Sequence, residues 1–171
     1  NHPCEANPCD YAQKQDPPLP PNSMGFVACC LGKAYPCLGP GAKDFDVSVK
    51  WCILEHERSH ISRNKWCNNV GNSGCRMPCM KGRDLGGGWF DSSCDRDECM
   101  AYNVGIVCLA SALAKYGCKP KDAPGFGNLP PGQRRKCQDL VRGIASECSD
   151  GRGACARANM PISPQCDKWK Q

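Results

Sequence analysis

The stretch WCILEHERSHISRN, from Trp51 to Asn64, contains two of the three histidines in the chain. His56 and His60 stand four residues apart, and Glu57 directly follows the first of them. On a helix, residues at this spacing project from one face, so both imidazoles could reach one metal ion. Glu57 is not placed as a ligand, but it could take a proton from water at the open side of the metal. The stretch therefore predicts a hydrolytic zinc site, and the alternative is a polar helix face with two exposed histidines.

The residues around this motif predict that it lies on a helix. Cys52 and Ile53 share the face of the two histidines at spacings of three and four residues. This periodicity predicts a helix from about Asp46 to Arg63, with Asp44 or Asp46 as its N-cap. The motif thus has the helical context that a zinc site of this kind requires.

A catalytic zinc site needs a third protein ligand. In the pattern HExxHxxGxxH a third histidine supplies it, but Arg63 and Trp66 stand where the glycine and the last histidine would be. His2 is the only other histidine, and it lies in a proline-rich terminus. We therefore expect the third ligand to be a carboxylate.

Glu98 is the carboxylate best placed for this role, because it opens a second predicted helix in the passage DECMAYNVGIVCL. A carboxylate in the first turns of a helix that packs against the motif helix could point at the metal. Tyr102 lies four residues later on the same face, where its hydroxyl could orient Glu98 or stabilise an oxyanion. An equally good reading makes Tyr102 a half-buried aromatic without a chemical role. The rival ligands are Asp84, Asp91, Asp95 and Asp97.

Cysteine is unusually frequent, with 17 cysteines among 171 residues. They are spread from Cys4 to Cys166 and are not gathered into repeated CxxC pairs, which favours disulfides over zinc ribbons. The odd number leaves at least one thiol free or paired outside the chain. We expect a single cysteine-rich domain over residues 1–171, either secreted or in an oxidising compartment such as the periplasm. Because the chain begins at Asn1 without a signal-like segment, we expect a mature product or a fragment of a longer protein.

The charge is mild and scattered, with 22 basic and 17 acidic residues and a formal net charge of +5. The one dense basic run, GQRRKC from Gly132 to Cys137, precedes a helix-like pattern and is interpreted as a solvated helix start. No apolar run approaches the ~20 residues that span a bilayer. The sequence therefore predicts neither a nucleic-acid partner nor a membrane span.

Outside the motif helix, the first part of the chain predicts little regular structure except a hairpin. Residues 1–22 are rich in proline and are expected to form an extended surface segment. Two runs rich in apolar residues and cysteine flank Gly32-Lys33 and predict a β-hairpin from Gly25 to Cys37. The glycine-rich part from Lys65 to Asp91 is expected to be a long irregular loop.

Two further helices are predicted in the second half. One begins near Asp91, with Ser92 or Ser93 as N-cap, and ends with Gly117 as its C′ residue. The other covers about Gln133 to Cys148, and the tail after it is expected to be irregular. The sequence thus predicts a small, helix-dominated α+β fold with about three helices and a short β-hairpin or sheet.

An HExxH motif followed by a helix-borne glutamate resembles the gluzincin branch of the zincin metallopeptidases. The passages GFVACCLGKAYPC, CILEHERSH and DECMAYNVGIVCL, which cover about Gly25 to Leu109, resemble zinc-peptidase-like domains at the C-termini of bacterial Rhs- and PAAR-type polymorphic toxins. The resemblance implies a zincin-like catalytic domain with Zn²⁺ held by His56, His60 and Glu98, and with Glu57 as general base. No longer gluzincin signature surrounds the third ligand.

The resemblance also implies a role for the hairpin, because zincins commonly bind extended substrate along a sheet edge. The alternative is that the hairpin is only a disulfide-stapled scaffold. The leading hypothesis is a secreted or exported zinc metallopeptidase, as the toxic effector domain of a bacterial secretion-system protein. Its substrate would be a protein or a peptidoglycan peptide, and a cognate immunity protein would be its partner.

Two other functions stay open from the sequence. A zinc amidase acting on a non-peptide amide would use the same site. A disulfide-rich binding module would carry a structural or vestigial zinc site, which requires a fourth ligand and no open position. Cys52, Cys67 or Cys99 could supply that ligand unless a disulfide occupies it.

Overall fold

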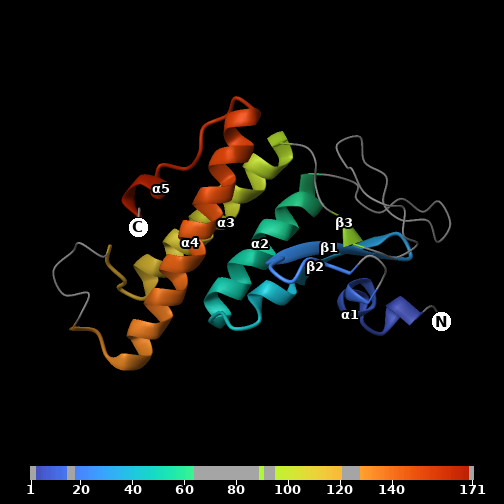
Figure 1. Cartoon of the computed structure of the whole chain (residues 1–171), viewed down its shortest axis with the longest axis horizontal. Coiled ribbons are helices and arrows are strands. Elements are labelled where there is room, and N and C mark those ends of the chain that lie inside the picture. Colours follow the sequence, from blue (N-terminus) through green and yellow to red (C-terminus); the bar gives the residue numbers. More distant parts are fainter. Residues whose placement is uncertain (1–2, 15–17, 64–88, 91–94, 121–127, 170–171) are drawn as a thin grey trace.

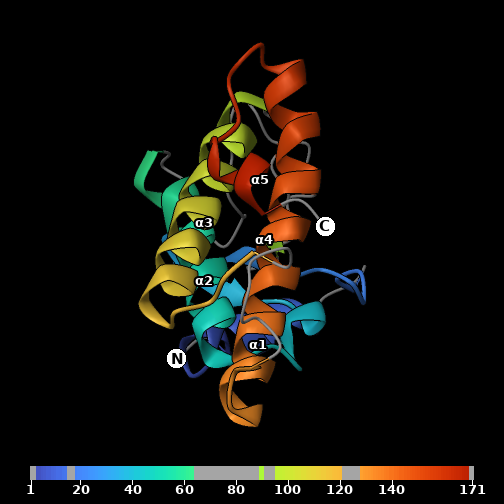
Figure 2. The ribbon, with the colours of Figure 1, turned by 90° about the vertical axis from the view of Figure 1, so that its left-hand side faces the viewer.

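The computed structural model describes residues 3–14, 18–63, 89–90, 95–120 and 128–169 (Figure 1). Its three long helices are α2 (Val47–Arg63), α3 (Asp95–Lys115) and α4 (Pro131–Arg157). α3 packs against α2 on one side and α4 on the other, and α2 also packs on a small β-sheet (Figure 1 and Figure 2). The predicted helix-dominated α+β fold is thereby confirmed.

The sheet is antiparallel and has the strand order β2-β1-β3. β1 (Gly25–Cys30) and β2 (Lys33–Leu38) form the predicted hairpin. The turn residues are Leu31 and Gly32, both with positive φ, so the turn lies one residue earlier than predicted. β1 is the central strand, because β3 (Trp89–Phe90) pairs with its other side.

β3 corrects part of the prediction for the segment from Lys65 to Asp91, which was expected to be wholly irregular. This two-residue strand forms because the free edge of β1 offers unpaired backbone groups. No local sequence pattern predicts its pairing with β1. The rest of the predicted loop lies outside the described residues, as do its candidate ligands Asp84 and Asp91.

The expectation of an extended segment over residues 1–22 is wrong for its first half. A 3-10 turn, η1 (Pro3–Glu5), and a short helix, α1 (Pro8–Gln13), form there. Pro8 stands in the first turn of α1, where a missing N–H costs nothing, and Asn7 Oδ1 accepts a hydrogen bond from Asp10 N at 3.1 Å. The disulfides Cys4–Cys30 and Cys9–Cys37 fasten this part to the hairpin.

The ends of α2 and α3 follow the predicted capping chemistry where they are described. Asp46 Oδ1 accepts from Ser48 N at 2.9 Å, which makes Asp46 the N-cap of α2. Gly117 has φ +66° after the end of α3, and Cys118 N donates to Leu113 O at 2.9 Å. This is the glycine-terminated helix end that was predicted. The predicted N-caps of α3, Ser92 and Ser93, lie outside the described residues.

α4 is longer than the predicted helix from Gln133 to Cys148. Gly151 lies beyond the predicted helix, but in the structure α4 continues through this residue. Because Gly151 has no side chain, α4 can approach α3 closely there. A Cβ at Gly151 would lie 2.9 Å from the Cβ of Tyr102. The tail is also not wholly irregular, since α5 (Gln165–Lys168) forms one turn that the disulfide Cys148–Cys166 holds against α4.

Disulfides connect the elements throughout the described ranges. Besides the three already named, Cys52–Cys108 joins α2 to α3, Cys99–Cys155 joins α3 to α4, and Cys118–Cys137 joins the end of α3 to α4. Cys29 is disulfide-bonded as well. All cysteines in the described ranges are therefore oxidised.

α3 is, within the part of the chain that the structure describes, the one helix long and apolar enough to cross a membrane by length and composition. These criteria alone are weak evidence, because core helices pass the same test. α3 places Ile106, Leu109 and Leu113 in the core between its two neighbouring helices. The absence of a membrane span stays a prediction.

Candidate metal centre

The HExxH motif lies in the second half of α2, and the side chains of His56, Glu57 and His60 are buried. The exposed fractions of His56, Glu57 and His60 are 6%, 7% and 3%. The two imidazole centroids lie 5.1 Å apart on one helix face. The alternative of two exposed histidines on a solvated face is therefore wrong.

Glu98 reaches the same point from α3. Its Oε2 lies 3.9 Å from His56 Nε2, and its Oε1 lies 3.6 Å from His60 Nε2. The ligand atoms of the three residues all lie within 4.8 Å of one another, and this group could hold a metal ion. Two imidazole nitrogens and one carboxylate form the donor set that catalytic zinc sites use, so the residues present fit zinc. The structure thus brings together all three predicted ligands.

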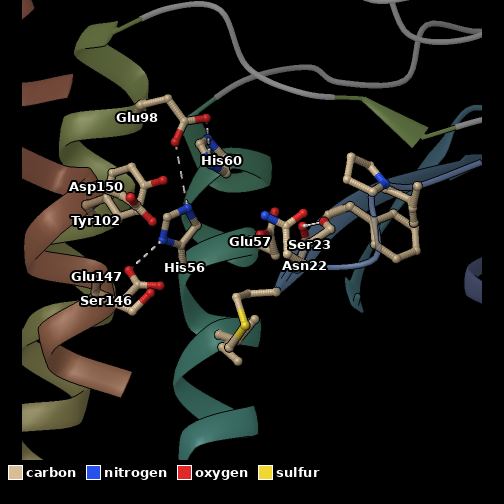
Figure 3. A pocket seen from close by; sticks show the side chains of 16 residues that line it. Asn22, Ser23, His56, Glu57, His60, Glu98, Tyr102, Ser146, Glu147 and Asp150 are labelled. Carbon is tan, nitrogen blue, oxygen red and sulfur yellow. Dashed lines mark hydrogen bonds and ion pairs between the residues drawn. The ribbon is translucent and has the colours of Figure 1, made fainter. Parts of the chain in front are cut away.

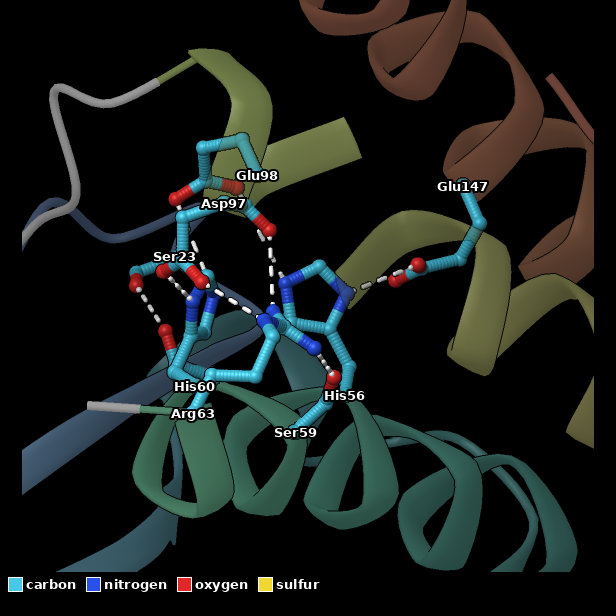
Figure 4. Close-up of polar contacts among 9 residues, drawn as sticks. Ser23, His56, Ser59, His60, Arg63, Asp97, Glu98 and Glu147 are labelled. Atoms are coloured by element: carbon cyan, nitrogen blue, oxygen red, sulfur yellow. Dashed lines mark hydrogen bonds and ion pairs between the residues drawn. The ribbon is translucent and has the colours of Figure 1, made fainter. Parts of the chain in front are cut away.

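The opposite ring nitrogens are held by two further carboxylates (Figure 4). His60 Nδ1 donates to Asp97 Oδ2 at 2.6 Å, and His56 Nδ1 donates to Glu147 Oε2 at 3.0 Å. A carboxylate that accepts the Nδ1 proton fixes the tautomer in which Nε2 carries the lone pair. In the neutral rings that a metal would bind, both Nε2 lone pairs would therefore point toward Glu98.

Asp97 is in turn held in place by an arginine from α2. Arg63 Nε donates to Asp97 Oδ1 at 2.8 Å, and Arg63 Nη2 donates to the Asp97 carbonyl at 3.0 Å. Arg63 Nη1 also donates to the buried Ser59 Oγ. Asp97, a rival metal ligand in the sequence, thus orients His60 instead. The rival Asp95 is paired with Arg157 at 2.8 Å.

These contacts give the two histidines different proton affinities in the metal-free protein. Burial lowers the pKa of His56, but the charge and hydrogen bond of Glu147 outweigh it and raise that pKa to about 9. Burial dominates at His60 and lowers its pKa despite the hydrogen bond to Asp97. Burial also opposes ionisation of Asp97, but the hydrogen bonds from His60 and Arg63 hold its pKa below the usual range. Asp97 is therefore an anion at neutral pH.

Glu57 and Tyr102 line a cavity of about 280 Å³ that opens beside the three ligands (Figure 3). β1 passes close to Glu57, since a Cβ at Gly25 would lie 2.5 Å from Glu57 Oε1. The ring of Tyr102 packs edge-on against His56, with centroids 4.7 Å apart. Burial and the nearby Glu98 raise the pKa of Tyr102, so its hydroxyl keeps its proton and can donate.

Glu147 was not recognised in the sequence as part of the site. It lies 91 residues after His56 and comes from α4, which places it beyond any local pattern. A glycine in the middle of α3 was the available signal. A Cβ at Gly105 would lie 2.6 Å from Glu147 Oε2, so this glycine makes room for the carboxylate.

Two of the three cysteines that could supply a fourth ligand are not available as thiolates. Cys52 and Cys99 are in disulfides and offer no thiolate, while Cys67 lies outside the described residues. Within the described ranges, the group that could hold a metal consists of His56, His60 and Glu98.

Comparison with protein-family models finds no match, and searches of the curated proteins and of the solved structures find none either. The fold and the site therefore define the chain only by class. It is a small, disulfide-bonded α+β domain with a buried His–His–Glu group that could hold a metal ion.

Proposed function

We propose that this chain is a zinc-dependent metallopeptidase. The observation that carries the proposal is the pair of imidazoles whose Nδ1 atoms are tied to Asp97 and Glu147, with both Nε2 atoms directed at Glu98. A structural zinc site is closed by a fourth protein ligand, and the described residues offer three beside a cavity. This favours a site with an open position over a binding module with a structural ion.

The residues around the site have distinct roles in peptide hydrolysis. Bound zinc lowers the pKa of water to roughly 7 and polarises the scissile carbonyl. Glu57 takes a proton from the attacking water and hands it to the leaving nitrogen as the carbon–nitrogen bond breaks. Tyr102 donates a hydrogen bond to the oxygen that gains negative charge. Asp97 and Glu147 keep the imidazoles aligned throughout.

The disulfides support an oxidising setting, outside the cell or in the periplasm. We propose within this setting that the domain is a toxic effector that cleaves proteins or peptidoglycan peptides and is countered by an immunity protein. The resemblance of the HExxH and DECMAYNVGIVCL passages to polymorphic-toxin domains supports this part of the proposal. β1 is flanked by β2 and β3, so the described sheet would receive an extended substrate along one of those outer strands or beside the unpaired end of β1.

The proposal is tested by replacing the general base. Glu57→Gln keeps the size of the side chain but cannot take a proton, so zinc should stay bound while peptide cleavage falls by about 10²- to 10⁴-fold. Metal content is measured on the purified protein, and cleavage of a pool of random decapeptides is followed by mass spectrometry. Glu55→Gln, on the same helix but paired with Arg58, is the matched control and should retain activity. A zinc-loaded Glu57→Gln protein with undiminished cleavage contradicts the proposal.

A further inference from the structure

The cavity beside the metal centre has two chemically different walls (Figure 3). The wall on the side of β1 and the segment before it is uncharged and carries apolar side chains beside the polar Asn22 and Ser23. Its apolar members, together with one residue of α2, are Leu19, Pro20, Met24, Phe26 and Ile53. The wall formed by α3 and α4 is acidic, and no lysine or arginine lines this cavity within the described residues.

Three of the four carboxylates around the cavity have roles at the proposed metal site. Glu98 is a candidate metal ligand, Glu57 is the candidate base, and Glu147 holds His56. Asp150, one turn after Glu147 on α4, has none of these roles. Its carboxylate makes no hydrogen bond or ion pair with any residue in the described ranges.

Asp150 stands where the main cavity meets a second hollow between α3 and α4. Glu98, Tyr102 and Asp150 line both, and the second hollow continues along α4 past Ser149 and Gly153 to Arg157, which lines its far part. Figure 3 shows the Asp150 carboxylate beside Tyr102, on the α4 side of the site. A substrate group passing the metal on this side would meet Asp150.

The arginines nearest in α4 do not neutralise this wall. Arg157 Nε is paired with Asp95 Oδ1 at 2.8 Å. Arg152 Nη2 lies 3.8 Å from Asp167 Oδ1 and donates to the Cys166 carbonyl. Burial raises the pKa of Asp150, and the charge of Glu147 raises it further. The four carboxylates also outnumber the two positive charges of a divalent ion.

We propose that the α3–α4 wall is a subsite for a cationic group of the substrate, an ammonium or guanidinium, and that Asp150 selects it. The proposal deepens the proposed peptidase function and rests on it. Opposite charges at a cleft attract the substrate and orient it. The apolar wall on the other side of the metal would receive an uncharged side chain, so the two walls together set the direction in which a peptide lies.

The test uses the zinc-loaded protein and a pool of random decapeptides. In the cleavage arm, lysine and arginine should be enriched at one fixed position relative to the broken bond. Asp150→Asn should reduce that enrichment by about threefold to tenfold, since a partly screened ion pair contributes modestly. Asp44→Asn, an exposed acid that does not line the cavity, is the matched control and should leave the preference unchanged. Thermal unfolding of each variant shows that the fold is kept.

A binding arm separates this proposal from the proposed function. The same pool is passed over immobilised, zinc-loaded Glu57→Gln protein, which needs no turnover, and retained peptides are sequenced. Enrichment of basic peptides that disappears with Asp150→Asn supports the subsite even if the wild-type chain cleaves nothing, in which case only the peptidase proposal fails. Equal retention of basic and neutral peptides, or an enrichment that survives Asp150→Asn, overturns the subsite. Peptidoglycan stem peptides with free and with acetylated amines, compared in the same way, show whether their ammonium groups use it.

Discussion

Other carboxylates hold the far nitrogens of His56 and His60, the two histidines of the group that could hold a metal ion. Each ring is buried, and each Nδ1 donates to an acid on another helix, Asp97 on α3 and Glu147 on α4. A buried imidazole without such a partner would carry the uncompensated free-energy cost of desolvating its N–H, and its ring would rotate more freely. At the residue scale, the metal centre is therefore a five-residue arrangement whose outer members set the direction of the inner lone pairs.

The contribution of these outer carboxylates is measurable as zinc affinity. Asp97→Asn keeps the shape of the side chain but removes the anion, and we expect zinc affinity to fall by about 10- to 100-fold. Glu98→Gln should cost more, because it replaces a ligand. Competition with a chelating dye measures both, with Asp95→Asn as the control from the same helix turn. An unchanged affinity in folded Asp97→Asn protein would show that Asp97 does not orient His60.

At the scale of elements, close helix packing is what assembles the site. α3 must lie near α2 for Glu98 to reach the histidines, and α4 must lie near α3 for Glu147 to reach His56. Glycines at the α3–α4 contact permit the second approach, since a Cβ at Gly105 would lie 2.6 Å from Glu147 Oε2 and one at Gly151 would lie 2.9 Å from Tyr102 Cβ. Glycine in a helix interior costs roughly 1 kcal/mol relative to alanine, so its presence at both positions indicates that the closeness of α3 and α4 is worth that cost.

The hairpin turn offers a test at the same scale. Leu31 has φ +47° and is 48% exposed, a conformation that asparagine adopts far more readily than leucine. Leu31→Asn creates an Asn-Gly turn and should raise the free energy of unfolding by about 0.5–1 kcal/mol. Urea unfolding of the oxidised protein measures the change. Leu31→Ala removes the same side chain without favouring positive φ, so an equal gain in both variants would refute the backbone explanation.

The whole molecule is held by a covalent network as much as by its core. The disulfides in the described ranges join α1 to the hairpin, α2 to α3, α3 to α4, and α5 to α4. They join α2 to α3 and α3 to α4, the helices that carry the candidate metal ligands and the carboxylates that hold them. Disulfides chiefly lower the conformational entropy of the unfolded chain, and each typically adds about 2–4 kcal/mol to the free energy of unfolding.

Reduction should therefore dismantle the domain. Treatment with a strong thiol reductant is expected to abolish cooperative unfolding and to make the chain sensitive to trypsin, because the loss of several cross-links exceeds the usual stability of a domain. Far-UV circular dichroism and limited proteolysis, with and without zinc, measure the effect. A fold that resists reduction in the absence of zinc would weaken the assignment to an oxidising compartment.

The sequence by itself determined the features that depend on short-range order. The helix around His56 and His60, an aspartate cap at Asp44 or Asp46, the hairpin and the glycine end of α3 all follow from spacing and capping rules that act within a few residues. Glu98 was also found this way, because few glutamates exist and only one begins a predicted helix.

Only the tertiary structure decided what the remaining residues do. Asp97 was one of several equal carboxylates until α3 packed on α2 and turned it to His60, 37 residues away in sequence. Glu147 gained its place through α4, and Gly151 lies beyond the predicted helix although in the structure it lies within α4 and contacts Tyr102. The helix in the proline-rich N-terminus likewise depends on disulfides to a distant hairpin. Contacts between distant segments depend on the shape of the packed chain, which local periodicity does not encode.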